Sequence, residues 1–204
     1  MNTIDVIFRH DDVREESLVG KVAIIIDVLR ATSVMATALA HGAKRVLTLA
    51  DVNEALEMKS KHPELLLAGE RNAVKLKGFD LGNSPLEMTS ELLKGRDLLM
   101  CTTNGTQAIA AAKQADQLYT AALINMKSVV DEIAPLRQDL VIICSGTKGL
   151  FSLDDGLAAG ILVNRLMKRK AYHLTDNARL MSLAIQEEKD LKKALKECYH
   201  LKVL

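Results

Sequence analysis

Residues 22–26, Val-Ala-Ile-Ile-Ile, and residues 140–144, Leu-Val-Ile-Ile-Cys, are two apolar runs that decide the fold. Neither run alternates with polar residues, so a strand formed from it would be apolar on both faces. Strands of that kind lie in the middle of largely parallel sheets that helices cover on both sides. The two runs therefore predict an α/β fold.

Further strands and helices alternate on either side of these runs. Helix start and stop signals lie between the strands, as with Thr32 or Ser33 before residues 34–40 and Gly42 after them. This order predicts a three-layer α/β/α sandwich with a largely parallel or mixed central sheet, in one domain spanning residues 1–204. The predicted strands are Thr3–Phe8, Val22–Leu29, Arg45–Leu49, Leu65–Ala68, Asp97–Cys101, Gln117–Ala121 and Leu140–Cys144, and the predicted helices are 32–40, a start at Ser84-Pro85, 105–113, 126–134, 154–168 and 178–197.

Composition narrows the class of partner. Lys and Arg number 27 against 26 for Asp and Glu, so the chain has no global basic field of the kind that attracts nucleic acid. No apolar run approaches the roughly 20 residues that span a bilayer, and the first residues lack the features of a secretory signal. The three cysteines have no close pairing, which favours a reducing compartment. We expect a cytoplasmic protein without nucleic-acid or membrane partners.

Polar segments follow four of the predicted strands. Ligands of open α/β sheets bind at the carboxyl ends of the strands. If these strands are parallel, the four segments gather along one edge and form a binding site there. The segments are residues 27–33, 69–72, 102–106 and 145–149.

Two of these segments have the composition of an anion-binding loop. In Thr102–Thr106, small residues let the backbone approach a ligand, and the hydroxyl groups and the following helix can donate hydrogen bonds to it. The alternative is an ordinary helix cap with a tight turn, and Ser145–Gly149 has the same ambiguity. Asp27 and Arg30 could likewise form a purely structural ion pair.

Several hydrolytic chemistries are excluded by spacing. Six positions after Cys101 and Cys144 stand Gln107 and Leu150, where a cysteine phosphatase needs Arg, and Leu29 stands where an aspartyl-phosphate enzyme needs a second Asp. The chain has no Walker loop, no GxGxxG, no GxSxG and no HExxH motif. Metal-assisted hydrolysis of a phosphate ester remains. Its oxygen ligands would come from the carboxylates Asp27, Glu70, Asp80, Asp154 and Asp155, which the sequence does not rank.

The four segments together resemble the 2-phosphosulfolactate phosphatase (ComB) family over about residues 3–180. The matching stretches are Asp27-Val-Leu-Arg-Ala-Thr-Ser33, Gly69-Glu-Arg-Asn72 with Gly78-Phe-Asp-Leu-Gly-Asn-Ser-Pro85, Thr102-Thr-Asn-Gly-Thr106, and Gly146-Thr-Lys-Gly-Leu-Phe-Ser152 followed by Asp154-Asp155. The resemblance implies an α/β/α fold, a homo-oligomer such as a dimer, and Mg²⁺-dependent hydrolysis of 2-phospho-3-sulfolactate to 3-sulfolactate and phosphate. It also implies a role in coenzyme M biosynthesis or sulfolactate metabolism.

Roles carry over from the family by matching position. The resemblance implies catalytic roles for Asp27, Arg30, Glu70, Arg71 and Asp154, and magnesium ligation by Asp27, Glu70, Asp80 and Asp155. It implies substrate binding by Thr32, Ser33, Asn72, Asn83, Ser84, Thr103, Asn104, Gly105, Thr106, Gly146 and Ser152.

The chain departs from the family at its C-terminal end. Members usually continue with a basic, glycine-containing segment, whereas this sequence ends at Cys198-Tyr-His-Leu-Lys-Val-Leu204. If that segment completes the site, the protein is a non-catalytic binder of a small phosphorylated or sulfonated anion. A second alternative is a phosphatase for a related 2-phospho acid, because Arg and Lys bind carboxylate and phosphate equally well and residues do not identify a sulfonate.

Overall fold

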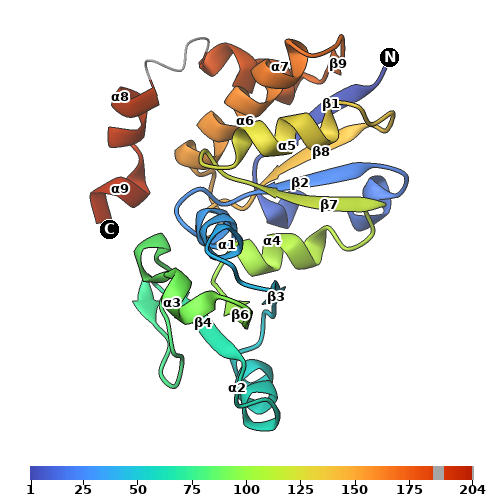
Figure 1. The fold of residues 1–204 in the computed structure, drawn as a ribbon. Coiled ribbons are helices and arrows are strands. Elements are labelled where there is room, and N and C mark those ends of the chain that lie inside the picture. The colour runs from blue at the N-terminus through green and yellow to red at the C-terminus, as the bar shows by residue number, and fades with distance from the viewer. Residues whose placement is uncertain (186–190, 204) are drawn as a thin grey trace.

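A computed structural model describes residues 1–185 and 191–203 of the protein (Figure 1). The strands are β1 (Thr3–Ile7), β2 (Val22–Ile26), β3 (Arg45–Thr48), β4 (Leu66–Arg71), β5 (Val74–Lys75), β6 (Asp97–Cys101), β7 (Gln117–Ala121), β8 (Leu140–Cys144) and β9 (His173–Leu174). The α-helices are α1 (Ala31–Ala40), α2 (Val52–Lys61), α3 (Ser90–Leu93), α4 (Gly105–Ala111), α5 (Met126–Ile133), α6 (Leu153–Met167), α7 (Asp176–Ala184), α8 (Leu191–Lys196) and α9 (Tyr199–Val203). Short 3₁₀ helices are η1 (His10–Asp12), η2 (Glu15–Leu18) and η3 (Pro85–Glu87).

The first sheet has five strands in the order β7-β2-β8-β1-β9, and all its pairs are parallel. Alternate residues of β2 face opposite sides: Ile24 packs in the cluster that contains α5 and α6, and Ile25 packs against Ala108 of α4. Helices therefore cover both faces, as Figure 1 shows. This arrangement confirms the predicted three-layer α/β/α class and explains why β2 and β8 are apolar at every position.

The second sheet has four strands in the order β3-β6-β4-β5, parallel except for the antiparallel pair β4–β5. Helix α1 packs on one face, where Val34 joins Leu98 in a buried cluster, and α2 packs on the other, where Ala55 joins Leu99. The sequence analysis predicted one central sheet. The division into two was missed because the strands of both sheets are similarly apolar, and the sequence of a strand does not identify its partners.

The two sheets exchange helices. Helix α1 follows β2 of the first sheet but packs on the second, and α4 follows β6 of the second sheet but packs on the first. The two helices contact each other, and Ile109 of α4 packs against the clusters of both sheets. Consequently the connections β2–α1 and β6–α4 pass side by side between the sheets.

Gly105 marks the point of closest approach between these connections. A Cβ atom at this position would lie 2.5 Å from Ala31 Cβ and 2.7 Å from Asp27 Oδ2. The backbones can approach this closely because Gly105 has no side chain.

Two predicted elements differ from the structure. The charged helix predicted over residues 178–197 ends as α7 at Ala184, because Ile185 has an extended backbone with φ −139° and ψ 88°. Residues 186–190 of that prediction lie outside the described residues. Ser84-Pro85 begins only the short η3, and Ser84 makes no side-chain capping hydrogen bond. Among the helices of the described ranges, none has both the length and the apolar character needed to cross a bilayer.

We expect Gly105→Ala to destabilise the protein, although alanine favours helices over glycine by about 0.5–1 kcal/mol. The new methyl group would overlap Ala31 and Asp27, and overpacking of this kind costs about 1–3 kcal/mol. Urea unfolding followed by circular dichroism measures the change. Gln107→Ala, at an exposed position of the same helix, is the control and should change the free energy of unfolding little. A more stable Gly105→Ala variant would contradict the close approach of the two connections.

Candidate active site

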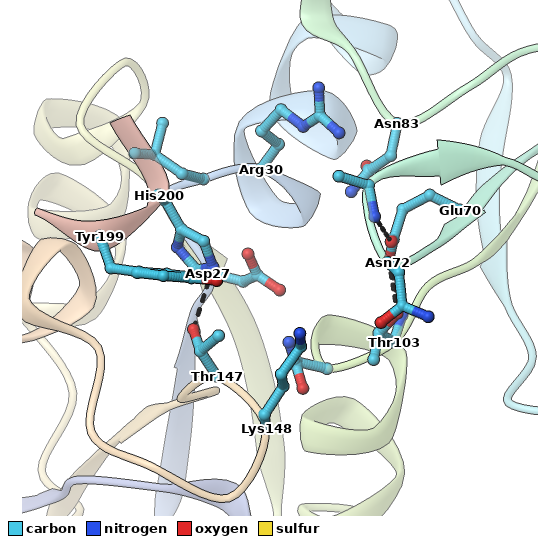
Figure 2. A pocket seen from close by; sticks show the side chains of 13 residues that line it. Asp27, Arg30, Glu70, Asn72, Asn83, Thr103, Thr147, Lys148, Tyr199 and His200 are labelled. Carbon is cyan, nitrogen blue, oxygen red and sulfur yellow. Dashed lines mark hydrogen bonds between the residues drawn. The ribbon is translucent and has the colours of Figure 1, made fainter. Parts of the chain in front are cut away.

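A pocket of about 200 Å³ lies where loops from both sheets meet (Figure 2). Its walls come from the β2–α1 and β6–α4 connections, the β4–β5 turn, the loop after β8, and helix α9. The volume is below the roughly 300–1,000 Å³ of sites for drug-sized molecules, so the ligand is small. The residues that line it are Asp27, Leu29, Arg30, Glu70, Asn72, Ala73, Asn83, Thr103, Asn104, Thr147, Lys148, Tyr199 and His200.

Asp27 occupies the end of β2 and is only 7% exposed. Burial raises the pKa of Asp27 to about 6, helped by the charge of Asp154 and opposed by the hydrogen bond from the Ala31 N–H, 3.2 Å long. Thr32 fixes the β2–α1 connection. Its hydroxyl donates to the Asp27 carbonyl at 2.7 Å and accepts from the Asp27 N–H at 3.1 Å. Ser33 donates to the Val28 carbonyl at 2.7 Å. Thr32 and Ser33, predicted to bind substrate, thus hold the backbone and do not line the pocket.

Glu70 joins two walls of the pocket. Its Oε1 accepts hydrogen bonds from the N–H and the hydroxyl of Thr103, both at 2.8 Å, and its Oε2 accepts from the Ala73 N–H at 2.8 Å. Asn72 and Ala73 form the β4–β5 turn with left-handed backbones, φ 52° and 64°, a conformation typical of tight hairpin turns. Glu70 therefore holds the turn against the β6–α4 connection, and both its oxygens already have partners.

Asp155 lies beneath the pocket, 2% exposed, and does not line it. Its Oδ1 accepts from the Val28 N–H at 2.9 Å, and its Oδ2 accepts from the Ser145 hydroxyl and the Gly146 N–H at 3.2 Å each. Burial raises the pKa of Asp155 well above its ordinary value, and the charges of Asp27 and Asp154 add to this rise. Metal binding by Asp155 stays a prediction, since both its oxygens already accept hydrogen bonds from the loops and it does not line the pocket.

Asp154 connects the start of α6 to helix α9. Its Oδ1 accepts from the Ser152 hydroxyl at 2.7 Å, and its Oδ2 lies 3.3 Å from Nδ1 of His200. The other ring nitrogen of His200 lies 3.0 Å from the Thr147 hydroxyl, which donates to Ser152 at 3.2 Å. The hydrogen bond with Asp154 raises the pKa of His200, while burial opposes the rise. Asp154 thus acts on the pocket through His200.

Arg30 and Lys148 supply positive charge to the pocket from different sides (Figure 2). Within the described ranges, the structure gives neither side chain a hydrogen-bond or ion-pair partner. Lys148 and Gly149 form a turn with left-handed backbones, closed by hydrogen bonds between Thr147 and Leu150 of 2.9 and 3.0 Å. The φ of 52° at Lys148 lies in the left-handed region, and its side chain extends into the pocket (Figure 2).

Several predicted residues lie outside the pocket. Asp80 was predicted to bind the metal, but its Oδ2 accepts from the Leu67 N–H at 2.8 Å and from Lys59 at 3.1 Å, so it fixes the edge of the second sheet. Arg71 was predicted to be catalytic, but its guanidinium donates to the carbonyls of Glu70 and Ala50 at 2.9 and 3.0 Å. The other predicted residues that do not line the pocket are Ser84, Gly105, Thr106, Gly146 and Ser152.

Several residues that line the pocket were not predicted from the sequence to belong to the site. Thr147 and Lys148 belong to the polar segment 145–149, so their place after a strand gave a signal for them. Tyr199 and His200 follow no strand, and sequence spacing gave no reason to bring α9 to the pocket. Leu29 and Ala73 are apolar lining residues without such a signal.

The donors of the pocket suit a magnesium ion held by few protein ligands. Among the described residues, no group of three or more His, Cys, Asp or Glu side chains is arranged to hold a metal. Magnesium, however, commonly binds through one or two carboxylates, with waters and phosphate oxygens as the other ligands. Asp27 supplies a carboxylate, and the buried Oδ1 of Asn83 has no hydrogen-bond partner in residues 1–185 and 191–203. These hard oxygens fit the ion, and Asp27 and Asn83 are the residues that would hold it.

The sequence matches known proteins along most of its length. The profile of a family described as 2-phosphosulpholactate phosphatase matches residues 7–204. A protein of Clostridium perfringens (strain 13 / Type A) named "Probable 2-phosphosulfolactate phosphatase" is 40% identical over 205 residues, which cover 98% of this chain and 83% of that protein.

Relatives with the same name come from two further species. Those of Clostridium acetobutylicum and Clostridium novyi are 41% and 39% identical over 201 and 202 residues, and each match covers 98% of this chain and 86% of the relative. The matched region includes every residue that lines the pocket. The chain therefore belongs to the 2-phosphosulfolactate phosphatase family.

Proposed function

We propose that the protein is a phosphoric monoester hydrolase that converts 2-phospho-3-sulfolactate to 3-sulfolactate and phosphate in a magnesium-dependent reaction. The observation that carries the proposal is a pair of cations, Arg30 and Lys148, that have no partner within the described part of the chain and lie in a small pocket with the oxygen donors of Asp27 and Asn83. The family of the chain supports the same reaction. A substrate with phosphate, sulfonate and carboxylate groups matches this mixture of charges.

The two cations suit different parts of such a substrate. The guanidinium of Arg30 can donate two parallel hydrogen bonds to phosphoryl oxygens, a geometry that an ammonium group cannot reproduce. Arg30 also stands directly before the first turn of α1, whose helix dipole favours a negative charge at this end, and the N–H groups of Ala31 and Thr32 there donate to Asp27. We assign the phosphoryl group to the side of Asp27 and Arg30, and the sulfonate or carboxylate group to Lys148.

Magnesium, when bound, would supply Lewis-acid polarisation of the phosphoryl group. The protein would orient the ester between Arg30 and Lys148 and shield it from bulk water within the pocket. Glu70 contributes by keeping the turn of Asn72 fixed against the β6–α4 connection. Arg30 would stabilise the negative charge that develops on the transferring phosphoryl oxygens. Electrostatic stabilisation of this kind is the main contribution to phosphoryl transfer.

Steady-state assays of phosphate release test the reaction directly. We expect the protein to hydrolyse 2-phosphosulfolactate faster than 2-phospholactate, and excess EDTA to abolish the activity until Mg²⁺ is restored. Asp27→Ala should lower kcat/KM at least about 100-fold, because Asp27 would hold the metal. Glu132→Gln, which changes an exposed carboxylate outside the pocket, is the control. Saturable binding of 2-phosphosulfolactate without turnover would instead favour a non-catalytic binder, and full activity in EDTA would refute the metal mechanism.

Removal of the charge of Asp27 should stabilise the metal-free protein at neutral and alkaline pH. The pKa of Asp27 is about 6 in the folded protein against 3.8 ordinarily, so ionisation of this buried carboxylate opposes folding as the pH rises through 6. We expect Asp27→Asn to raise the free energy of unfolding by about 2–3 kcal/mol at pH 8 and by much less at pH 4. Urea denaturation in EDTA at both pH values measures this. An equal effect at both pH values would contradict the assigned cause.

Lys148→Gln should weaken substrate binding and leave the fold intact. Hydrogen bonds to charged groups contribute about 1.5–3 kcal/mol, so we expect KM for 2-phosphosulfolactate to rise roughly 10-fold or more with a smaller change in kcat. Lys113→Gln, an exposed lysine outside the pocket, is the matched control. An unchanged KM in the Lys148 variant would show that the second anionic group binds elsewhere.

A further inference from the structure

Helix α9 brings a titratable side chain to the pocket that the proposed function has not used. His200 lines the pocket together with Asp27, and Figure 2 shows its contact with Thr147. Hydrogen bonds also link its ring to Asp154, which accepts from Ser152, and Ser152 contacts Thr147. Hydrolysis of an alkyl phosphate leaves an alkoxide, which needs a proton as it departs. Imidazole is the side chain that most often gives a proton in such reactions.

Both ring nitrogens of His200 face oxygen atoms. Nδ1 lies 3.3 Å from Oδ2 of Asp154, and Nε2 lies 3.0 Å from the Thr147 hydroxyl. Asp154 also accepts from the Ser152 hydroxyl at 2.7 Å, and Thr147 contacts Ser152 at 3.2 Å. This arrangement suits the imidazolium form of His200, which can donate from both nitrogens.

The charges around His200 favour its imidazolium form. Asp154, at the start of α6, is 1% exposed and forms an ion pair with the ring. Asp27, at the end of β2, adds a second negative charge, and Arg30, at the start of α1, opposes both. Burial also lowers the pKa of His200. The hydrogen bond and the charge of Asp154, with the charge of Asp27, outweigh these effects, so the pKa of His200 is raised.

We propose that His200 is the general acid of this phosphatase and donates its Nε2 proton to the ester oxygen of the leaving group. The assignment rests on the proposed function. In the step, the oxygen of a water molecule forms a bond to phosphorus, and the P–O ester bond breaks with its electron pair on the ester oxygen. That oxygen takes the Nε2 proton and leaves as the alcohol, which makes His200 neutral. The attacking water releases a proton to solvent, and solvent reprotonates His200, so the net reaction consumes one water.

Asp154 and Thr147 have separate parts in this step. Asp154 is a positioning residue, because it holds Nδ1 and thereby directs Nε2 toward the wall that Thr147 forms. Thr147 itself lines the pocket, so an ester oxygen beside its hydroxyl group can share the Nε2 proton.

Leaving groups of different basicity test the proposal. His200→Gln should lower kcat/KM for 2-phosphosulfolactate by about 100-fold or more, as expected for loss of a general acid. The same variant should lower kcat/KM for acetyl phosphate far less, because acetate leaves as a stable carboxylate and needs no proton. Asp154→Asn should show the same selective loss. His173→Gln, an exposed histidine on β9, is the matched control and should behave as wild type on both compounds.

The possible results distinguish a failure of the general-acid proposal from a failure of the proposed phosphatase function. Equal losses on both compounds, or no loss on either, in a His200 variant of an active wild type would overturn the role of His200 alone. A wild type that hydrolyses neither compound would overturn the phosphatase and the general acid together.

A second measurement does not depend on turnover. In ¹⁵N spectra of the full chain at pH 7, we expect His200 to show two protonated ring nitrogens and Asp154→Asn to lose this signature. A neutral ring in the wild type would overturn the proposal.

Discussion

The close approach of the β2–α1 and β6–α4 connections is the constraint on which the rest of the structure depends. Each connection leaves one sheet and delivers its helix to the other, and they can pass each other only because Gly105 has no side chain against Asp27 and Ala31. This crossing places the ends of β2 and β6 at one junction. The pocket therefore lies between two sheets, with Asp27 and Arg30 from one connection and Thr103 and Asn104 from the other.

The junction concentrates negative charge in a place with little solvent. Asp27, Asp154 and Asp155 are all buried, and their mutual repulsion contributes to the raised pKa of Asp27 and Asp155. Backbone N–H groups and His200 offset part of this repulsion. Such an arrangement opposes folding, and a bound cation would relieve it, so the site and the stability of the protein depend on the same carboxylates.

The sequence predicted the fold class and the segments that meet at the pocket, because both follow from local patterns. The apolar runs of β2 and β8 identify buried parallel strands, and polar residues after strands identify Asp27 and Asn104 as site candidates. The division into two sheets depends on which strands pair, which no single strand encodes. Asp80 was assigned to the site by its matching position in the family, whereas its carboxylate accepts a hydrogen bond from the backbone of β4.

His200 lines the pocket but could not be predicted from the sequence, for a different reason. It comes from a short helix after the last long helices, has no motif around it, and meets Asp154 across 46 positions of the sequence. Only the three-dimensional packing of α9 reveals its neighbours.

The exchange of helices also bears on how the molecule can be divided. In sequence, the second sheet, β3 to β6, is inserted between β2 and β7 of the first, which would suggest a detachable module. If the second sheet were removed, the apolar face of α1 that packs on it would become exposed. The strand β6 that leads into α4 would also be lost, and with it the helix that covers one face of the first sheet. We therefore expect the two sheets to unfold together, because each buries a helix that the connection from the other sheet supplies.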